Sequence, residues 1–309
     1  MESRRLHSPE GGVRLPDVTS WSVRDATVSL ESPVVVGILN VTPDSFSDGD
    51  LWIEPAAAVD HALRMVDDGA DLVDVGAEST RPGAQPVDPE PEWGRLEPVV
   101  KGLAARGIRF SIDTTKLEIA SRALDSGAAA INDVSGLRFS PEIAPLCAAH
   151  GAGLILMHMR GEPRTMQADV AYADLVGEVR RFLEAQASLA LSAGCAPDQI
   201  VIDPGIGFGK SAEGNLELLG RVADLSQLGY PVLVGPSRKS FMGKVLGLPL
   251  EQRLEATIAA CLSAHQGGAK LFRVHDVGPA RRALDMAEAI RRTVHDRTNA
   301  QPERRRDAG

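Results

Sequence analysis

The sequence predicts an α/β fold, a (β/α)₈ TIM barrel, from three observations. Eight short apolar runs recur between residues 34 and 274, and segments with helical periodicity lie between them. The units extend from residue 34 to about residue 294, which fits the ~250-residue size usual for this barrel. Gly or Pro follows most of the helical segments, as expected where a helix ends before the next strand.

A doubly wound open sheet is the rival architecture. It would place a Gly-rich phosphate-binding loop after the first strand. Residues 40–49 follow the first apolar run and contain no GxGxxG pattern. We therefore favour the barrel.

The elements are expected in the following order. Residues 1–16 are polar and contain Gly and Pro, which predicts disorder. Residues 21–30 alternate around Arg24 and Asp25, which predicts a β-hairpin that could cover the lower mouth of the barrel. The expected barrel strands are 34–39, 72–75, 109–112, 129–132, 154–157, 200–202, 232–234 and 271–274. The clearest expected helices are 54–68, 89–106, 172–193 and 252–266.

These elements predict one barrel domain over residues 17–296, followed by a disordered tail over residues 297–309. The tail contains three consecutive arginines, which we interpret as a solvated charge run. The chain carries a net charge of -9 without a clustered basic face, which argues against a nucleic-acid partner.

The sequence contains few features that indicate a cellular compartment. Cys147, Cys195 and Cys261 are far apart and form no CxxC pair, so neither a disulfide framework nor a zinc site is expected. The first residues lack the apolar segment of a signal peptide. No apolar run approaches the ~20 residues of a membrane span. We expect a cytoplasmic protein without membrane contact.

Polar residues follow every apolar run, at the strand ends where a barrel carries its active site. They are Asn40, Asp74, Glu78, Asp113, Asn132, Asp133, His158, Asp203, Ser237, Arg238, Lys239, Arg273, His275 and Asp276. Some are expected only to cap helices, since Asp and Asn are good N-caps. Asp74 and Asp133 are the first candidates for such a structural role.

The remaining residues divide by charge. Asp113, Asn132 and Asp203 suit a ligand with a donor-rich, guanidine-like edge, because a carboxylate can accept two parallel N–H bonds. The cationic set suits phosphate oxygens, and its members are Arg238, Lys239, Arg273 and His275. The sequence therefore predicts a heterocyclic ligand that bears an anionic group.

Three loops complete the pattern. Residues 42–49 and 78–86 are long, polar and rich in helix breakers, and we expect mobile lids, with plain surface loops as the alternative. Residues 203–211, DPGIGFGKS, do not form a Walker loop, because Pro204 stands where that motif needs Gly. Their glycines are expected to let the backbone and Phe208 approach a flat ligand closely.

Eight motifs occur in order along the chain: GILNVTPDSFSDG, DVGAESTRPGA, SIDT, INDVSG, LMHMRG, DPGIGFGK, GPSRKSF and RVHDV. Together they resemble the dihydropteroate synthases, a family of pterin-binding TIM barrels that are usually homodimers. Members of this family are transferases of folate biosynthesis. They condense 6-hydroxymethyl-7,8-dihydropterin pyrophosphate with p-aminobenzoate, giving 7,8-dihydropteroate and pyrophosphate. Sulfonamides compete with p-aminobenzoate in the family.

The resemblance implies roles for individual residues. The pterin would be bound by Asp113, Asn132, Asp203, Phe208, Lys239 and Arg273. The pyrophosphate would meet Asn40, Arg273 and His275, with Mg²⁺ bridging it to Asn40. The p-aminobenzoate site would be formed by Phe46, Asp48, Thr80, Arg81, Pro82 and Ser237. Residues implied to act in catalysis are Asn40, Asp48, Lys239, Arg273 and His275.

This chemistry suits the residue types. An aniline nitrogen is already nucleophilic, and no Ser-His-Asp or Cys-His arrangement is apparent in the sequence. Breaking the C–O bond to pyrophosphate is the hard step, so an SN1-like substitution is expected. Two alternatives stay open, which are a methyltransferase that handles methyltetrahydrofolate and a paralogue that binds pterin without synthase activity. The sequence departs modestly from the family pattern, as at Asp50, where a second Gly is common.

Overall fold

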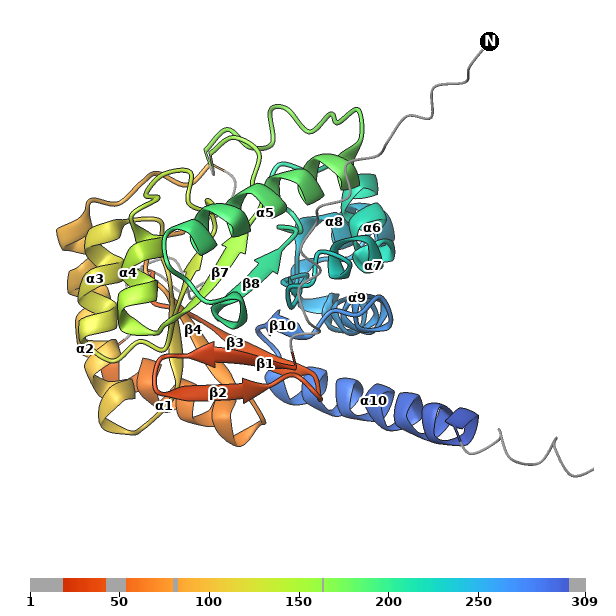
Figure 1. Cartoon of the computed structure of the whole chain (residues 1–309), viewed down its shortest axis with the longest axis horizontal. Helices are drawn as coiled ribbons and strands as arrows, with labels where there is room; N and C mark the ends of the chain where they lie inside the picture. Colours follow the sequence, from red (N-terminus) through yellow and green to blue (C-terminus); the bar gives the residue numbers. More distant parts are fainter. Residues whose placement is uncertain (1–18, 43–53, 80–82, 163, 300–309) are drawn as a thin grey trace, which may run out of the picture.

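An eight-stranded parallel barrel forms the centre of the molecule (Figure 1). The computed structural model describes residues 19–42, 54–79, 83–162 and 164–299. The barrel strands are β3 (Val34–Asn40), β4 (Leu72–Gly76), β5 (Phe110–Asp113), β6 (Ala130–Asp133), β7 (Gly153–Met157), β8 (Ile200–Asp203), β9 (Leu233–Val234) and β10 (Leu271–Val274). Their order is β8-β7-β6-β5-β4-β3-β10-β9, and a bridge between Ile202 and Val232 joins β8 to β9. The predicted (β/α)₈ fold is confirmed.

Helices cover the outside of these strands (Figure 1). They are α1 (Pro55–Asp67), α2 (Pro89–Ala105), α3 (Leu117–Asp125), α4 (Ile143–His150), α5 (Leu175–Ser192), α6 (Ala212–Gly220), α7 (Val222–Ser226), α8 (Ser240–Leu246), α9 (Leu254–Gln266) and α10 (Val277–Asn299), with short 3₁₀ turns η1 (Pro197–Gln199) and η2 (Leu250–Gln252). Local signals set some of their ends. The Asp174 side chain accepts the Gly177 N–H and caps α5, while Gly151 ends α4 in the left-handed region at φ 60°.

The predicted hairpin is present at one end of the barrel. Strand β1 (Ser20–Val23) pairs antiparallel with β2 (Ala26–Ser29), and β7 and β8 run away from this hairpin (Figure 1). Trp21 is fully buried, and its Nε1 donates to the Gln199 carbonyl at 3.0 Å. A Cβ at Gly153, the first residue of β7, would lie 2.7 Å from the Trp21 ring. The hairpin therefore covers the lower mouth of the barrel, as expected.

The barrel interior changes from apolar to polar along the strands. Hairpin residues pack in one cluster with the strand starts, including Val34, Leu72 and Leu271. Two residues further along β4 from Leu72, on the same face, comes Asp74, and β3 ends at Asn40. Polar interior positions are thus concentrated at the carboxyl ends of the strands.

The C-terminal boundary differs from the prediction. Helix α10 continues through residues 297–299, which the sequence placed in the tail. Residues 1–16 and the rest of the tail lie outside the described residues. None of the helices in the described part of the chain combines the length and apolar character that a membrane crossing requires.

Candidate active site

One row of residues crosses four adjacent strands at their carboxyl ends. Asn40 on β3 pairs with Gly76 on β4, Gly76 with Asp113 on β5, and Asp113 with Asn132 on β6. A Cβ at Gly76 would lie 3.5 Å from the Asp113 Cβ and 3.9 Å from the Asn40 Oδ1. The residue between the two polar side chains is small, so they line the same space. Three predicted site residues are therefore brought together.

A buried ionic network lies directly beneath this row. Arg273 reaches across from β10, and its Nε donates to the Asp74 Oδ2 at 2.6 Å while its Nη2 donates to the Asp113 Oδ2 at 3.1 Å. The Ser111 hydroxyl donates to the Asp74 Oδ1 at 2.6 Å, and the Asn132 Nδ2 donates to the Asp74 Oδ2 at 3.1 Å. Asp74 is fully buried. The prediction that Asp74 caps a helix is wrong, because its carboxylate points into the barrel and both of its oxygens accept hydrogen bonds from these side chains.

Asp133 has a structural role, as the sequence predicted, but its hydrogen bonds lie in the turn after β6 and not at a helix N-terminus. Its carboxylate accepts the Ser135 N–H at 2.8 Å, the Ser135 hydroxyl at 2.7 Å and the Leu137 N–H at 2.7 Å. These bonds hold the turn after β6. Adjacent residues on one strand thus serve different purposes, with Asn132 facing the site and Asp133 fixing the turn.

Asn132 carries a buried acceptor without a partner among the described residues. Its Nδ2 is engaged by Asp74, whereas its Oδ1 is buried and receives no hydrogen bond there. An unsatisfied buried acceptor costs roughly 1–3 kcal/mol. A ligand that donates an N–H to this oxygen would recover that cost.

Burial raises the pKa values of both predicted carboxylates. The pKa of Asp113 rises to about 7, since burial, Asp74 and Glu92 outweigh the cations Arg273 and Lys239. The pKa of Asp203 rises to about 6 through burial, although the Gly205 N–H donates to its Oδ1 at 2.6 Å. Perturbed carboxyl groups at one rim are typical of functional sites. Both favour a ligand that donates N–H groups, because such donors stabilise the ionised form.

Phe208 and Lys239 pack together beside these carboxylates. The Lys239 Nζ lies 4.1 Å from the Phe208 ring centroid, and burial lowers the pKa of Lys239 to about 8. Gly207 has φ 85°, and a Cβ there would come within 3.0 Å of the Lys239 Cδ. Gly205 has φ 68°, and a Cβ there would lie 2.0 Å from the His158 carbonyl oxygen. Glycine is therefore required at both positions for this loop to approach its neighbours.

His275 is paired with Ser237, and this corrects its predicted charge. The Ser237 Oγ accepts the His275 backbone N–H at 3.1 Å and lies 2.9 Å from the His275 Nδ1. Burial, reinforced by Arg273, lowers the pKa of His275 to about 4. The imidazole is neutral at neutral pH, so His275 offers a ligand a neutral hydrogen-bonding group where a cation was expected.

Arg238 does not join the cationic set. Its Nε and Nη2 donate to the two Asp276 oxygens at 2.9 and 2.5 Å. This two-point ion pair occupies the guanidinium. The anion-binding role suggested for Arg238 is therefore not supported, and its backbone adopts φ 56° at the turn before α8.

Lys210 is a feature that the sequence reasoning missed. Its ammonium is buried and lies 3.0 Å from the His158 Nδ1, 3.2 Å from the His158 carbonyl and 2.9 Å from the Phe208 carbonyl. Burial lowers the pKa of Lys210 to about 7. The lysine ties the loop after β8 to the end of β7. Its place inside the GFGK motif was the one feature of the sequence that could have identified Lys210.

A cavity of about 410 Å³ opens at the same rim. Its lining includes Asp113, Val134, Met159, Glu78 and Lys116. Lys116 forms ion pairs with Glu78 and with the buried Glu92. Phe46, Asp48, Thr80, Arg81 and Pro82, the loop residues predicted for the second ligand, lie outside the described residues.

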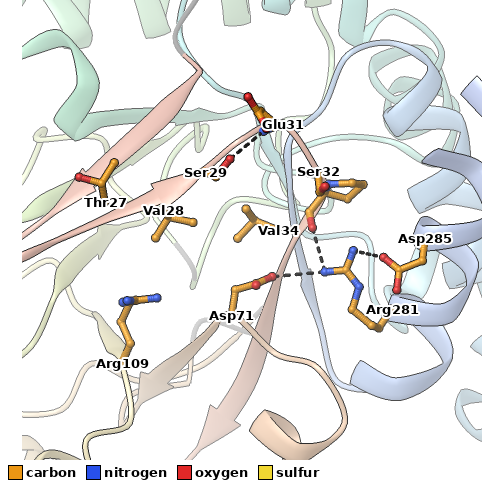
Figure 2. Close-up of a pocket in the computed structure, with 11 residues that line it drawn as sticks. Thr27, Val28, Ser29, Glu31, Ser32, Val34, Asp71, Arg109, Arg281 and Asp285 are labelled. Atoms are coloured by element: carbon orange, nitrogen blue, oxygen red, sulfur yellow. Dashed lines mark hydrogen bonds and ion pairs between the residues drawn. The ribbon is translucent and has the colours of Figure 1, made fainter. Parts of the chain in front are cut away.

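A second cavity, of about 460 Å³, lies at the opposite end of the barrel (Figure 2). Three of its charged groups pair, since Arg281 contacts Asp71 at 3.3 Å and Asp285 at 2.5 Å, and Arg281 also donates to the Pro33 carbonyl at 2.9 Å. None of the predicted site residues that the structure describes lines it. We interpret these contacts as fastening α10 to the base of the barrel.

Metal binding by protein groups alone is not supported within the described ranges. They contain no group of three or more His, Cys, Asp or Glu side chains placed to hold a metal ion. Asn40 offers one amide oxygen at the tip of β3. Mg²⁺ usually combines one or two protein oxygens with substrate phosphates. The donor set therefore fits an ion shared with a phosphorylated ligand.

Known proteins resemble this chain over most of its length. A family model described as pterin binding enzyme matches residues 36–275. The dihydropteroate synthase of Synechocystis sp. is 48% identical over 258 residues, which cover 83% of this chain and 89% of that protein. The Yersinia pestis dihydropteroate synthase, solved with a sulfonamide drug complex, matches with a TM-score of 0.84 and 40% identity, covering 88% and 99% of the two chains. The Burkholderia cenocepacia dihydropteroate synthase, complexed with 7,8-dihydropteroate, matches with a TM-score of 0.81 and 39% identity, covering 90% and 98%.

Proposed function

This chain belongs to the pterin-binding enzyme family, and from that premise we propose that it acts as a dihydropteroate synthase. It would condense 6-hydroxymethyl-7,8-dihydropterin pyrophosphate with p-aminobenzoate, yielding 7,8-dihydropteroate and pyrophosphate. One observation of the site carries the proposal furthest. N–H acceptors on β5, β6 and β8, buried or nearly so, stand beside the cations Lys239 and Arg273, which matches a donor-rich heterocycle with an anionic leaving group.

The pterin would occupy the acceptor side. Its amino group and ring N–H would donate to Asp203, Asp113 and the Asn132 Oδ1, which has no partner among the described residues. Phe208, with Lys239 above its ring, would contact one face of the pterin. Arg273 would lie at the edge between ring and pyrophosphate, because it already bridges Asp74 and Asp113.

The pyrophosphate would occupy the side of Asn40, Arg273 and His275. Arg273 supplies a positive charge that is maintained at every physiological pH. A neutral His275 can donate one hydrogen bond from Nε2 when its Nδ1 accepts the Ser237 hydroxyl. Asn40 would hold a Mg²⁺ ion, which would supply charge neutralisation for the leaving group.

The p-aminobenzoate would bind at Ser237 and the two long loops. We carry over Phe46, Asp48, Thr80, Arg81 and Pro82 as the loop residues of this subsite. The sulfonamide complex of the Yersinia pestis enzyme supports sulfonamides as competitors for the same space.

The reaction follows an SN1-like course in this proposal. The C–O bond to pyrophosphate breaks with both electrons leaving on oxygen, and the electron-rich dihydropterin carries the positive charge. The neutral aniline nitrogen then forms the C–N bond and loses one proton to water. The protein's task is to orient the reactants and exclude competing water.

The alternatives are less well supported. A methyltetrahydrofolate methyltransferase would need the acceptor set but no pyrophosphate side, and the similar proteins reported above are all synthases. A silent pterin-binding paralogue should have lost site residues, whereas Asn40, Asp48, Arg81, Lys239 and Arg273 are all retained. A homodimer and a cytoplasmic location remain proposals.

The test of this function is pyrophosphate release by the purified protein. The pterin pyrophosphate and Mg²⁺ are supplied with and without p-aminobenzoate. We expect release that depends on p-aminobenzoate and a product with the mass of 7,8-dihydropteroate. Release that is indifferent to p-aminobenzoate, or none at all, would contradict the proposal.

A further inference from the structure

Asp74 is a fully buried carboxylate inside the barrel that contacts side chains from three other strands. We propose that Asp74 is a positioning residue for pterin recognition, holding Arg273 and Asn132 in the orientation in which they meet the dihydropterin pyrophosphate. This inference rests on the function proposed above. It assigns a role to a residue that the sequence placed among helix caps.

The position of Asp74 in the barrel supports an action through other residues. Asp74 pairs with Ile38 on β3 and Ser111 on β5, and it lies on the same face of β4 as Gly76, one inward position deeper. It therefore sits beneath the row of Asn40, Asp113 and Asn132. Three donors already fill its two oxygens, so it serves the ligand indirectly.

The bond to Asn132 determines how that amide is presented. The Asn132 Nδ2 donates to the Asp74 Oδ2 at 3.1 Å. This bond fixes the orientation of the amide, so that its Oδ1 is the atom left available to a ligand. That oxygen is the buried acceptor without a partner in the described part of the chain. Without the Asp74 carboxylate, the amide could rotate and offer a donor where the pterin also offers donors.

The bonds to Arg273 divide one guanidinium between two carboxylates. The Nε goes to Asp74 at 2.6 Å and the Nη2 to Asp113 at 3.1 Å. A neutral side chain at position 74 would leave Arg273 free to pair fully with Asp113. The pterin would then compete with a stronger internal ion pair for the Asp113 oxygens. Asp74 thus keeps Asp113 accessible as an acceptor.

The experiment compares Asp74→Asn with the wild type in steady-state assays of both substrates. We expect kcat/KM for the pterin pyrophosphate to fall about 100-fold, the scale of a misplacement near 1 Å. Its KM should rise while the KM for p-aminobenzoate stays within about two-fold of wild type. A purely structural role would lower the active fraction and leave both KM values unchanged.

Asp133→Asn is the matched control. Asp133 is equally buried and accepts three hydrogen bonds at the end of β6, but these bonds stabilise the turn after that strand. We expect it to lower the unfolding temperature without changing the KM for the pterin pyrophosphate. Should Asp74→Asn fail to fold, Ser111→Ala removes one of the Asp74 bonds while keeping the charge, and it should raise the same KM by a smaller factor.

A double-mutant cycle tests whether Asp74 acts through Arg273. Arg273→Lys cannot bridge two carboxylates with a planar fork, so combining it with Asp74→Asn should cost no more than the larger single effect. Strictly additive losses, or a wild-type KM for the pterin pyrophosphate in Asp74→Asn, would overturn the inference. If the wild type itself lacks p-aminobenzoate-dependent release, the proposed function fails instead, which separates the two claims.

Discussion

At the scale of single residues, burial decides what each group at the rim can do. Asp113 and Asp203 have raised pKa values, whereas His275 has a lowered one. The same loss of water thus makes the carboxyl groups easier to protonate and the imidazole harder to protonate. The result is a site whose fixed positive charge comes from Arg273 and whose acceptors respond to pH.

The first prediction concerns protons released by Asp113. The pKa of Asp113 is about 7 in the free protein. Pterin N–H donors favour the ionised carboxylate, so binding lowers this pKa. Near pH 6.5, binding of 6-hydroxymethyl-7,8-dihydropterin should therefore release a fraction of a proton, and at pH 8.5 almost none. Calorimetry in buffers of different ionisation enthalpy measures this release.

Asp113→Asn is the control for that measurement. It should reduce the release and leave only the part contributed by Asp203, whose pKa is about 6. Binding enthalpies at pH 6.5 that are the same in every buffer would contradict the assignment of these carboxyl groups to the pterin.

At the scale of elements, the strands were the most predictable part. Continuous apolar runs mark strands buried on both faces, and each of the eight expected runs corresponds to a barrel strand. Side-chain partners were less predictable. Period-two alternation places Asp74 inside the barrel, but only the closed barrel brings Arg273 from β10 to it. The Arg238 ion pair with Asp276 likewise depends on a turn geometry that spacing does not reveal.

The hairpin gives a prediction at this scale. Trp21 is fully buried beneath the barrel and contacts Gly153. Trp21→Ala should lower the free energy of unfolding by about 3–5 kcal/mol, as for large core deletions. Chemical denaturation followed by circular dichroism measures this change.

Leu216→Ala provides the comparison, because Leu216 on α6 is 47% exposed. Its effect should stay within about 0.5 kcal/mol. A similarly small effect of Trp21→Ala would show that the hairpin does not close the barrel base. KM values for both substrates should be unchanged in Trp21→Ala, because the hairpin lies at the opposite end from the site.

At the scale of the whole molecule, the barrel separates stability from chemistry. The hairpin, the apolar strand starts and the Arg281 contacts with Asp71 and Asp285 lie at one end. The row of Asn40, Asp113 and Asn132 lies at the other. Motif order along the sequence revealed this arrangement because successive strand ends converge in a barrel. The protonation of His275 and the role of Lys210 required the packed structure, since both depend on burial.

The pterin affinity of the Asp203→Asn variant tests most directly whether the strand-end carboxylates bind the pterin. Titration of wild type, Asp203→Asn and Asp133→Asn with 6-hydroxymethyl-7,8-dihydropterin, followed by calorimetry at pH 8, compares a proposed ligand acceptor with a structural carboxylate. We expect Asp203→Asn to weaken binding by about 10- to 100-fold, because a buried acceptor becomes a donor that faces the pterin N–H groups. We expect wild-type affinity for Asp133→Asn. Unchanged affinity in Asp203→Asn would contradict the assignment of the strand-end carboxylates to the pterin.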